Sequence, residues 1–151
     1  LVFSTLHTND SASAVTRLID MGIEPFLVST AVQAIIAQRL VRLLCPHCKE
    51  TYDPEEAQWA ELGSSREVAG PIFRADGCEK CLETGYRGRT GIYEFLQLSE
   101  AIKGLVLTTS DANQINKAAR AEGMLSLRED GISKVLEGKT TISEVLRVTQ
   151  I

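Results

Sequence analysis

The chain opens on LVFST, an apolar run of residues that favour strands, and polar capping residues follow it. We expect a strand over 1–5 that belongs to a longer protein. In SASAVTRLIDMG, apolar residues then recur at helical spacing until Gly22. The next segment has Pro25 where a helix would begin, and its apolar repeat runs to Ile36. The pattern therefore predicts a strand followed by two helices, the second of them well buried.

A short apolar segment, RLVRLLC, leads into the first of two cysteine pairs. Periodicity alone does not distinguish a strand from a helix end here, and we favour a strand over 39–45. Asp53 and Pro54 then predict a helix that Gly63 ends, with a loop over 64–77. After the second pair, the glycines of ETGYRGRTG favour tight turns, and IYEFLQL alternates like a strand.

The last third of the chain has a helical pattern. Ser99 and Asp111 are capping residues in front of apolar segments, and Gly123 ends the second of these. Two further helix starts have the spacing of a capping box: Ser126 with Glu129, and Thr141 with Glu144. Strands and helices of this kind predict an α+β fold.

Length, composition and charge disfavour several classes of protein. A chain of 151 residues with 44% hydrophobic content can fill a core. The longest apolar run is well below the roughly 18 residues of a membrane span, and no secretory signal pattern is present. The formal charge of -4 disfavours a general nucleic-acid binder, which needs a broad basic surface.

All four cysteines lie in two C-x-x-C pairs, CPHC at 45–48 and CEKC at 78–81. Two such pairs can present four thiolates to one Zn²⁺ at about 2.3 Å, and we expect a structural zinc site. A disulfide framework would need an oxidising compartment, and a thioredoxin-like motif uses a single pair. Disulfides, free thiols and an iron cluster remain alternatives. The expected ligands are Cys45, Cys48, Cys78 and Cys81.

A site closed by four thiolates has no open position for water or substrate, so this zinc would stabilise the fold. His47 lies within the first pair, and we interpret it as a surface residue. The segment GKT at 138–140 ends like a phosphate loop, but the required glycine is replaced by Ser133. We interpret Gly138 as a helix stop.

His7 follows the predicted strand and precedes a capped helix. The carboxyl end of a strand is where open α/β sheets bind ligands, so a functional role is one hypothesis. A structural imidazole is the alternative.

Several stretches together resemble the C-terminal part of the type II secretion and type IV pilus assembly ATPases. They are STLHTNDSASAVTRLIDMG, AQRLVRLLCPHC, CEKCLETGYRGRTGIYEFL and GMLSLREDGISKVLEGKTTISEVLRVT, in the order of that family. The resemblance covers nearly the whole chain and is weakest over 53–76. STLHTND resembles the family's histidine box. The cysteine pairs resemble the tetracysteine zinc module of assembly-type members, which retraction-type members typically lack.

The resemblance implies a fold in three parts. These are a C-terminal piece of a RecA-like α/β domain over 1–44, an inserted zinc-binding module over 45–91, and a return strand with a helical subdomain over 92–151. It also implies that His7 contacts or senses the terminal phosphate of ATP, with Thr5 and Thr8 beside it. Structural zinc is the implied cofactor, with ATP and Mg in the full-length parent.

The implied parent is a hexameric ATPase, cytoplasmic and peripheral to the inner membrane. It would couple ATP hydrolysis to pilin or pseudopilin assembly through an inner-membrane platform and cytoplasmic-domain proteins. The Walker A loop, acidic box and Walker B strand would lie upstream of Leu1, so we expect this chain alone to be inactive.

Two other hypotheses stay open. One is a helical adaptor with an incidental zinc. The other is a free-standing zinc-ribbon module that contacts protein or nucleic acid through basic residues, namely Arg39, Arg42, Lys49, Arg87 and Arg89.

Overall fold

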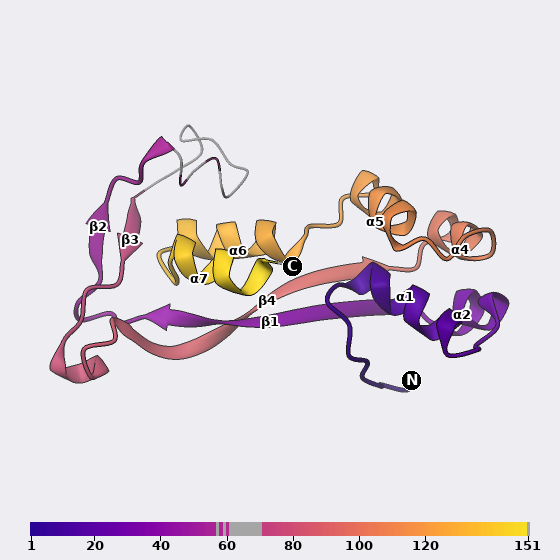
Figure 1. The fold of residues 1–151 in the computed structure, drawn as a ribbon, viewed down its shortest axis with the longest axis horizontal. Coiled ribbons are helices and arrows are strands. Elements are labelled where there is room, and N and C mark those ends of the chain that lie inside the picture. The colour runs from indigo at the N-terminus through magenta and orange to yellow at the C-terminus, as the bar shows by residue number, and fades with distance from the viewer. Residues whose placement is uncertain (57, 59, 61–70, 151) are drawn as a thin grey trace. The chain divides into compact units, whose positions relative to one another are not determined.

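The computed structural model describes residues 1–56, 58, 60 and 71–150 (Figure 1). The described helices and strands confirm the α+β class. Strand β1 pairs with β4, and β2 pairs antiparallel with β3. In chain order the elements are α1 (Ser11–Asp20), α2 (Pro25–Ala31), β1 (Ala34–Leu44), β2 (Glu50–Tyr52), β3 (Ile72–Arg74), the 3-10 helix η2 (Glu79–Cys81), β4 (Tyr86–Gln97), α4 (Glu100–Val106), α5 (Ala112–Ala121), α6 (Leu127–Leu136) and α7 (Ile142–Thr149).

The chain forms two compact units, and each is built from two separate segments. Unit 1 contains residues 1–38 and 93–126, and unit 2 contains 39–92 and 127–151. The cysteine pairs and helices α6 and α7 thus belong to the same unit. The three-part division of the parent expected from the sequence remains a prediction.

The core of unit 1 lies between helices α1, α2, α4 and α5 and the end of β4. Its buried apolar residues are Ala12, Val15, Val28, Leu96, Leu98, Ile102, Val106, Ile115 and Ala119. Glu94 is buried beside this core, where its Oε1 accepts hydrogen bonds from Ser11 N at 2.9 Å and Ser11 Oγ at 2.5 Å. A buried carboxylate needs such donors to replace water.

In unit 2, one apolar cluster contains Ile72 from β3 with Val135, Ile142 and Val145 from α6 and α7. Further apolar residues of this unit are also buried, namely Val41, Leu44, Ile92 and Leu127. Helices α6 and α7 approach closely because Gly131 has no side chain: a Cβ there would lie 2.6 Å from a Val145 methyl group. Polar contacts, such as the ion pair of Arg42 with Glu144, also join β1 to α7 in this unit.

The predicted helix caps at Ser99, Asp111 and Thr141 are confirmed. Each side chain accepts a hydrogen bond from a backbone N–H of the first turn. At Thr141 the bond comes from Glu144 N at 3.2 Å. The capping-box spacing predicts that the Glu144 side chain accepts a hydrogen bond from the backbone N–H of Thr141. In the structure, the Glu144 carboxylate instead accepts hydrogen bonds from Arg42 and Arg147.

The predicted strand over 1–5 is wrong in this structure. Residues 1–8 have no regular secondary structure, and Leu1, Val2 and Phe3 are at least 88% exposed. An apolar run becomes a strand only when another strand pairs with it. In the described part of the chain, β1 to β4 pair only among themselves.

The second predicted helix is also too long. Helix α2 ends at Ala31, Val32 is extended, and β1 begins at Ala34, so Ile35 and Ile36 lie in a strand. Alternate side chains of β1 are more buried, in the period of two that a strand imposes. Apolar β-branched residues suit either element, and pairing with β4 decides for the strand. The predicted strand over 39–45 is confirmed up to Leu44.

The predicted loop over 64–77 is wrong at Ile72–Arg74, which forms β3, because strand pairing is not visible locally. The predicted glycine turns are confirmed as far as Gly85, which has a φ of +73°, but β4 already starts at Tyr86. The predicted helix over 53–63 falls partly on residues outside the described ones. The helix stop at Gly138 is confirmed, because Gly138 has a φ of +67° between α6 and α7.

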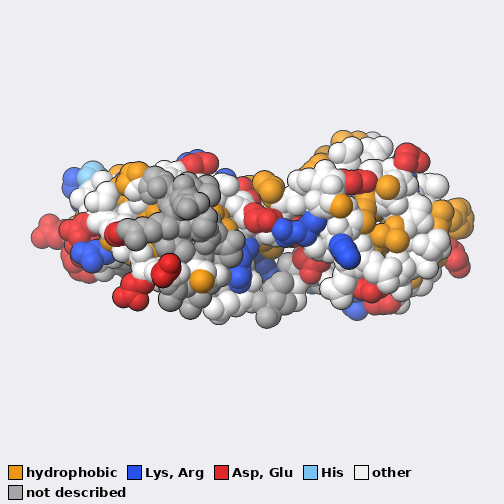
Figure 2. All heavy atoms as spheres, turned by 90° about the horizontal axis from the view of Figure 1, so that it is seen from above, with side chains coloured by type: hydrophobic (Ala, Val, Ile, Leu, Met, Phe, Trp, Pro, Cys, Tyr) orange, Lys and Arg blue, Asp and Glu red, His pale blue; other side chains and the backbone are white. Residues whose placement is uncertain are grey.

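Among the described residues, no helix is both long and apolar enough to cross a membrane. On the face drawn in Figure 2, acidic and basic side chains are interspersed over the described surface.

Candidate metal centre

The two cysteine pairs are positioned by the ends of strands. Cys45 follows β1, and Cys45 O accepts hydrogen bonds from Cys48 N and Lys49 N in a tight turn before β2. Cys78 is the N-cap of η2, and Cys81 is the last residue of this single turn. The backbone connects the pairs, because Cys45 N donates to Gly85 O at 2.9 Å. This bond brings together pairs that are separated by β2 and β3.

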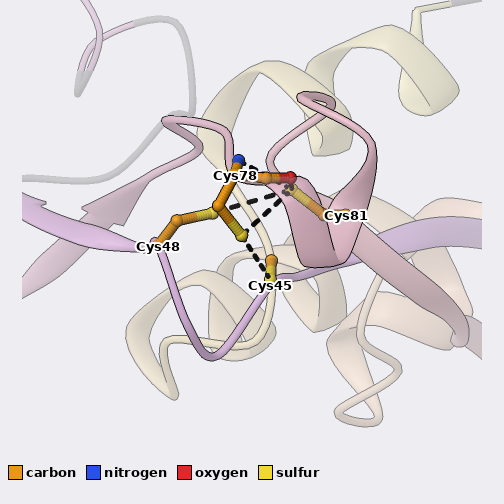
Figure 3. A group of neighbouring side chains, drawn as sticks. All are labelled: Cys45, Cys48, Cys78 and Cys81. Atoms are coloured by element: carbon orange, nitrogen blue, oxygen red, sulfur yellow. Dashed lines mark hydrogen bonds between the residues drawn. The ribbon is translucent and has the colours of Figure 1, made fainter.

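The four sulfur atoms converge on one point, all within 4.8 Å of one another (Figure 3). The separations are 3.9 Å for Cys45 and Cys78, 3.8 Å for Cys48 and Cys81, and 3.7 Å for Cys78 and Cys81. A tetrahedron with metal–sulfur bonds of about 2.3 Å has edges of about 3.8 Å. The residues present therefore fit a four-coordinate metal ion bound by thiolates. These separations are too long for a disulfide bond, and the cysteines are free.

The backbone already favours a thiolate at Cys81. Its Sγ accepts hydrogen bonds from Cys78 N and Gly85 N, both at 3.2 Å. Burial opposes ionisation, but these N–H groups and the neighbouring thiols lower the pKa of Cys81 to about 6. At Cys48, burial and the neighbouring thiols raise the pKa to about 12. A bound cation supplies the positive charge that four clustered thiolates require.

Gly85 contributes to the site in a way that the sequence does not reveal. It has a φ of +73°, and a Cβ there would lie 2.6 Å from Ala75 Cβ. Only glycine fits this backbone comfortably, and the resulting geometry directs its N–H at Cys81 Sγ. The signal in the sequence is a glycine four residues after the last cysteine, which by itself indicates only a turn.

His47 is exposed, and its Nδ1 lies 3.5 Å from Lys80 Nζ, which agrees with the predicted surface role. The structure places His7, Thr5 and Thr8 in unit 1, in the irregular segment before α1. His7 and Thr5 are exposed, and Thr8 Oγ1 donates to Asp10 O at 3.2 Å. Their role at a nucleotide remains a prediction.

Arg42 and Lys49, which were proposed to contact protein or nucleic acid, both make contacts within the chain. Arg42 Nη2 lies 2.6 Å from Glu144 Oε1, and its guanidinium stacks on the Tyr86 ring. Lys49 Nζ lies over the Phe73 ring and donates to Gly138 O. These contacts weaken the hypothesis of a free-standing nucleic-acid module.

Comparison with known families gives a match over almost the whole chain. The family model described as "Type II/IV secretion system protein" matches residues 1–147.

Individual proteins that are similar to this chain are named as type II secretion or type IV pilus assembly proteins. The chain is 51% identical, over 99% of its length, to "Type II secretion system protein E" of Pseudomonas aeruginosa. It is 47% identical, over its full length, to "Type IV pilus assembly ATPase TfpB" of Acinetobacter baylyi. It is 45% identical, over 99% of its length, to "Type IV pilus assembly ATPase PilB" of Thermus thermophilus. The chain spans 30%, 26% and 17% of these relatives, respectively.

Proposed function

Because the chain belongs to the Type II/IV secretion system protein family, we propose that it forms the C-terminal part of a secretion or pilus assembly ATPase. The match over residues 1–147 is the observation that carries this proposal. The parent would be a hexamer built on RecA-like domains, cytoplasmic and peripheral to the inner membrane. With ATP and Mg, it would drive pilin or pseudopilin assembly through an inner-membrane platform and cytoplasmic-domain proteins.

The chain's own contribution would be structural at the metal centre and chemical at His7. The four thiolates of Cys45, Cys48, Cys78 and Cys81 would hold Zn²⁺, which prefers tetrahedral sulfur sites. Zinc in a closed site adds folding free energy locally and leaves no position for substrate. His7, with Thr5 and Thr8 beside it, would contact the terminal phosphate of ATP in the parent.

Phosphoryl transfer requires a phosphate loop, its lysine and an acid that holds magnesium. The GKT segment does not supply them: Thr140 is fully buried, and its Oγ1 donates to Arg42 O at 2.8 Å. We therefore propose that the chain by itself does not hydrolyse ATP.

Two measurements test the proposal. Metal analysis of protein prepared without chelator should give about one zinc per chain, and a Cys78→Ser variant should bind zinc much more weakly. A zinc content near zero contradicts the metal assignment. Phosphate release by the purified chain should stay at background, whereas a full-length relative should turn over with magnesium. Magnesium-dependent turnover by the chain alone would overturn the functional assignment.

A further inference from the structure

The loop between α6 and α7, residues 137–141, is held by residues that flank the first cysteine pair. Leu44 directly precedes Cys45, and Leu44 N donates to Lys139 O at 2.8 Å. Lys49 directly follows Cys48, and Lys49 Nζ donates to Gly138 O at 3.0 Å. Two consecutive carbonyl groups of this loop are thus bound on either side of one pair of metal ligands.

The second cysteine pair reaches the same loop through Tyr86. Gly85 N donates to Cys81 Sγ, and the next residue, Tyr86, places its hydroxyl 2.9 Å from Thr141 Oγ1. Thr141 is the N-cap of α7. Residues next to both cysteine pairs therefore contact the segment from which α7 starts.

The close fit around Gly138 strengthens this connection. A Cβ on Gly138 would lie 2.7 Å from the Phe73 ring, and the same ring carries Lys49 Nζ at 4.3 Å from its centroid. The apolar cluster shared by β3, α6 and α7, with Ile72 and Val145 among its buried members, adds packing to these contacts.

From these contacts we propose that metal binding controls the docking of α6 and α7. A metal ion that fixes Cys45 and Cys48 also fixes Leu44 and Lys49, which donate to the loop. By fixing Cys81, it holds Gly85 and therefore the next residue, Tyr86, which contacts Thr141. Loss of the metal by chelation releases the 137–141 loop, and α6 and α7 detach while unit 1 stays folded. This inference rests on the proposed metal site. Because coupling between two equilibria is reciprocal, weakening the loop contacts must also weaken metal binding.

Hydrogen exchange of the whole chain, loaded with Zn²⁺ and then stripped with a chelator, tests the inference. Removal of zinc should speed exchange of α7 amides at least about 10-fold, while α1 and α5 amides change less than about two-fold. Unchanged protection in α7 after complete removal of zinc contradicts the coupling. Equal loss of protection in α1 and α5 also contradicts it, because the effect would then be global unfolding.

A variant that keeps all four cysteines tests the reverse direction. Lys49→Met retains the apolar stem over Phe73 but removes the donor to Gly138 O. It should speed transfer of zinc to a chromogenic chelator by about three-fold or more. Lys80→Met is the matched control, since Lys80 is exposed beside the second pair and should change transfer less than about 1.5-fold. If Lys49→Met and the unsubstituted chain transfer zinc at equal rates, the inference is overturned. If the unsubstituted chain binds no zinc at all, the metal assignment itself is contradicted, so the two failures are distinguishable.

Discussion

Glu144 of α7 binds Arg42 of β1 through both the backbone and the side chain of the arginine. Arg42 N donates to Glu144 Oε2 at 3.1 Å, and Arg42 Nη2 donates to Oε1 at 2.6 Å. Arg147 adds two further bonds to the same carboxylate. Burial opposes ionisation of Glu144, but the hydrogen bonds from Arg147 and Arg42 lower its pKa to about 2. The carboxylate is therefore charged at neutral pH and joins the C-terminal helix to the strand that leads to Cys45.

Replacing this carboxylate should weaken unit 2. Glu144→Gln keeps the size of the side chain but removes the charge that four hydrogen bonds recognise. Glu144 is 1% exposed, so we expect a loss of about 1–3 kcal/mol in the free energy of opening of α7. Native-state hydrogen exchange of α7 amides measures this value.

Glu137→Gln is the control for that substitution. Glu137 pairs with Lys139 on the surface, where both side chains are about half exposed, and such pairs contribute about 0.5 kcal/mol or less. If both variants lower the free energy of opening by similar amounts, the buried hydrogen bonds of Glu144 stabilise α7 no more than a surface ion pair does.

Alanine substitutions at two helical glycines should have opposite signs. Gly131→Ala places a Cβ within 2.6 Å of Val145 and should destabilise the α6–α7 contact by about 1–3 kcal/mol. A Cβ on Gly104 in α4 would meet no atom within 4 Å beyond the backbone of its own helix, so Gly104→Ala should stabilise that helix by about 0.5–1 kcal/mol. Thermal unfolding followed by residue-resolved exchange distinguishes the two. A stabilising Gly131→Ala would mean that α6 and α7 do not pack this closely.

Ser11→Ala should destabilise unit 1. The Ser11 hydroxyl donates at 2.5 Å to Glu94, which is 3% exposed, and its loss leaves a buried carboxylate short of a donor. We expect a cost of about 1–3 kcal/mol, measured by exchange of α1 amides.

Ser13→Ala is the matched control in the same helix. Its hydroxyl donates to Asp10, but the cap bond from Ser13 N to Asp10 remains after the substitution. The expected cost is about 0.5 kcal/mol or less. A larger effect at position 13 than at position 11 would contradict the importance of the Ser11–Glu94 contact.

His7→Ala should leave the melting temperature of this chain nearly unchanged, because His7 is exposed in an irregular segment. In a full-length protein the same change should lower ATP turnover roughly 10-fold, the effect of losing about 1.4 kcal/mol of transition-state stabilisation. Steady-state phosphate release measures the rate.

His47→Ala serves as the comparison for His7. His47 is also exposed, but it lies beside the metal centre, so its loss should alter neither turnover nor zinc content. Full turnover of the His7→Ala protein would remove His7 from the proposed site.

Much of the local structure and the clustering of the four cysteines could be predicted from the sequence. Helix caps such as Ser99 and Thr141 depend on bonds to residues three positions away, which a sequence displays directly. The C-x-x-C spacing is equally local, because two thiols at that spacing fit one turn around a metal ion. The family resemblance was visible for the same reason, since it rests on short motifs in a particular order.

The tertiary structure alone decided what depends on contacts between distant residues. Apolar residues from Val32 to Ile36 suit a helix or a strand, and only pairing with β4 selects β1. Lys49 and Gly138 are 89 positions apart, and Arg42 and Glu144 are 102 apart. No local pattern predicts such pairs, because their partners are chosen by the packing of whole elements. The contacts between the α6–α7 loop and the residues beside the cysteine cluster therefore became visible only in the folded chain.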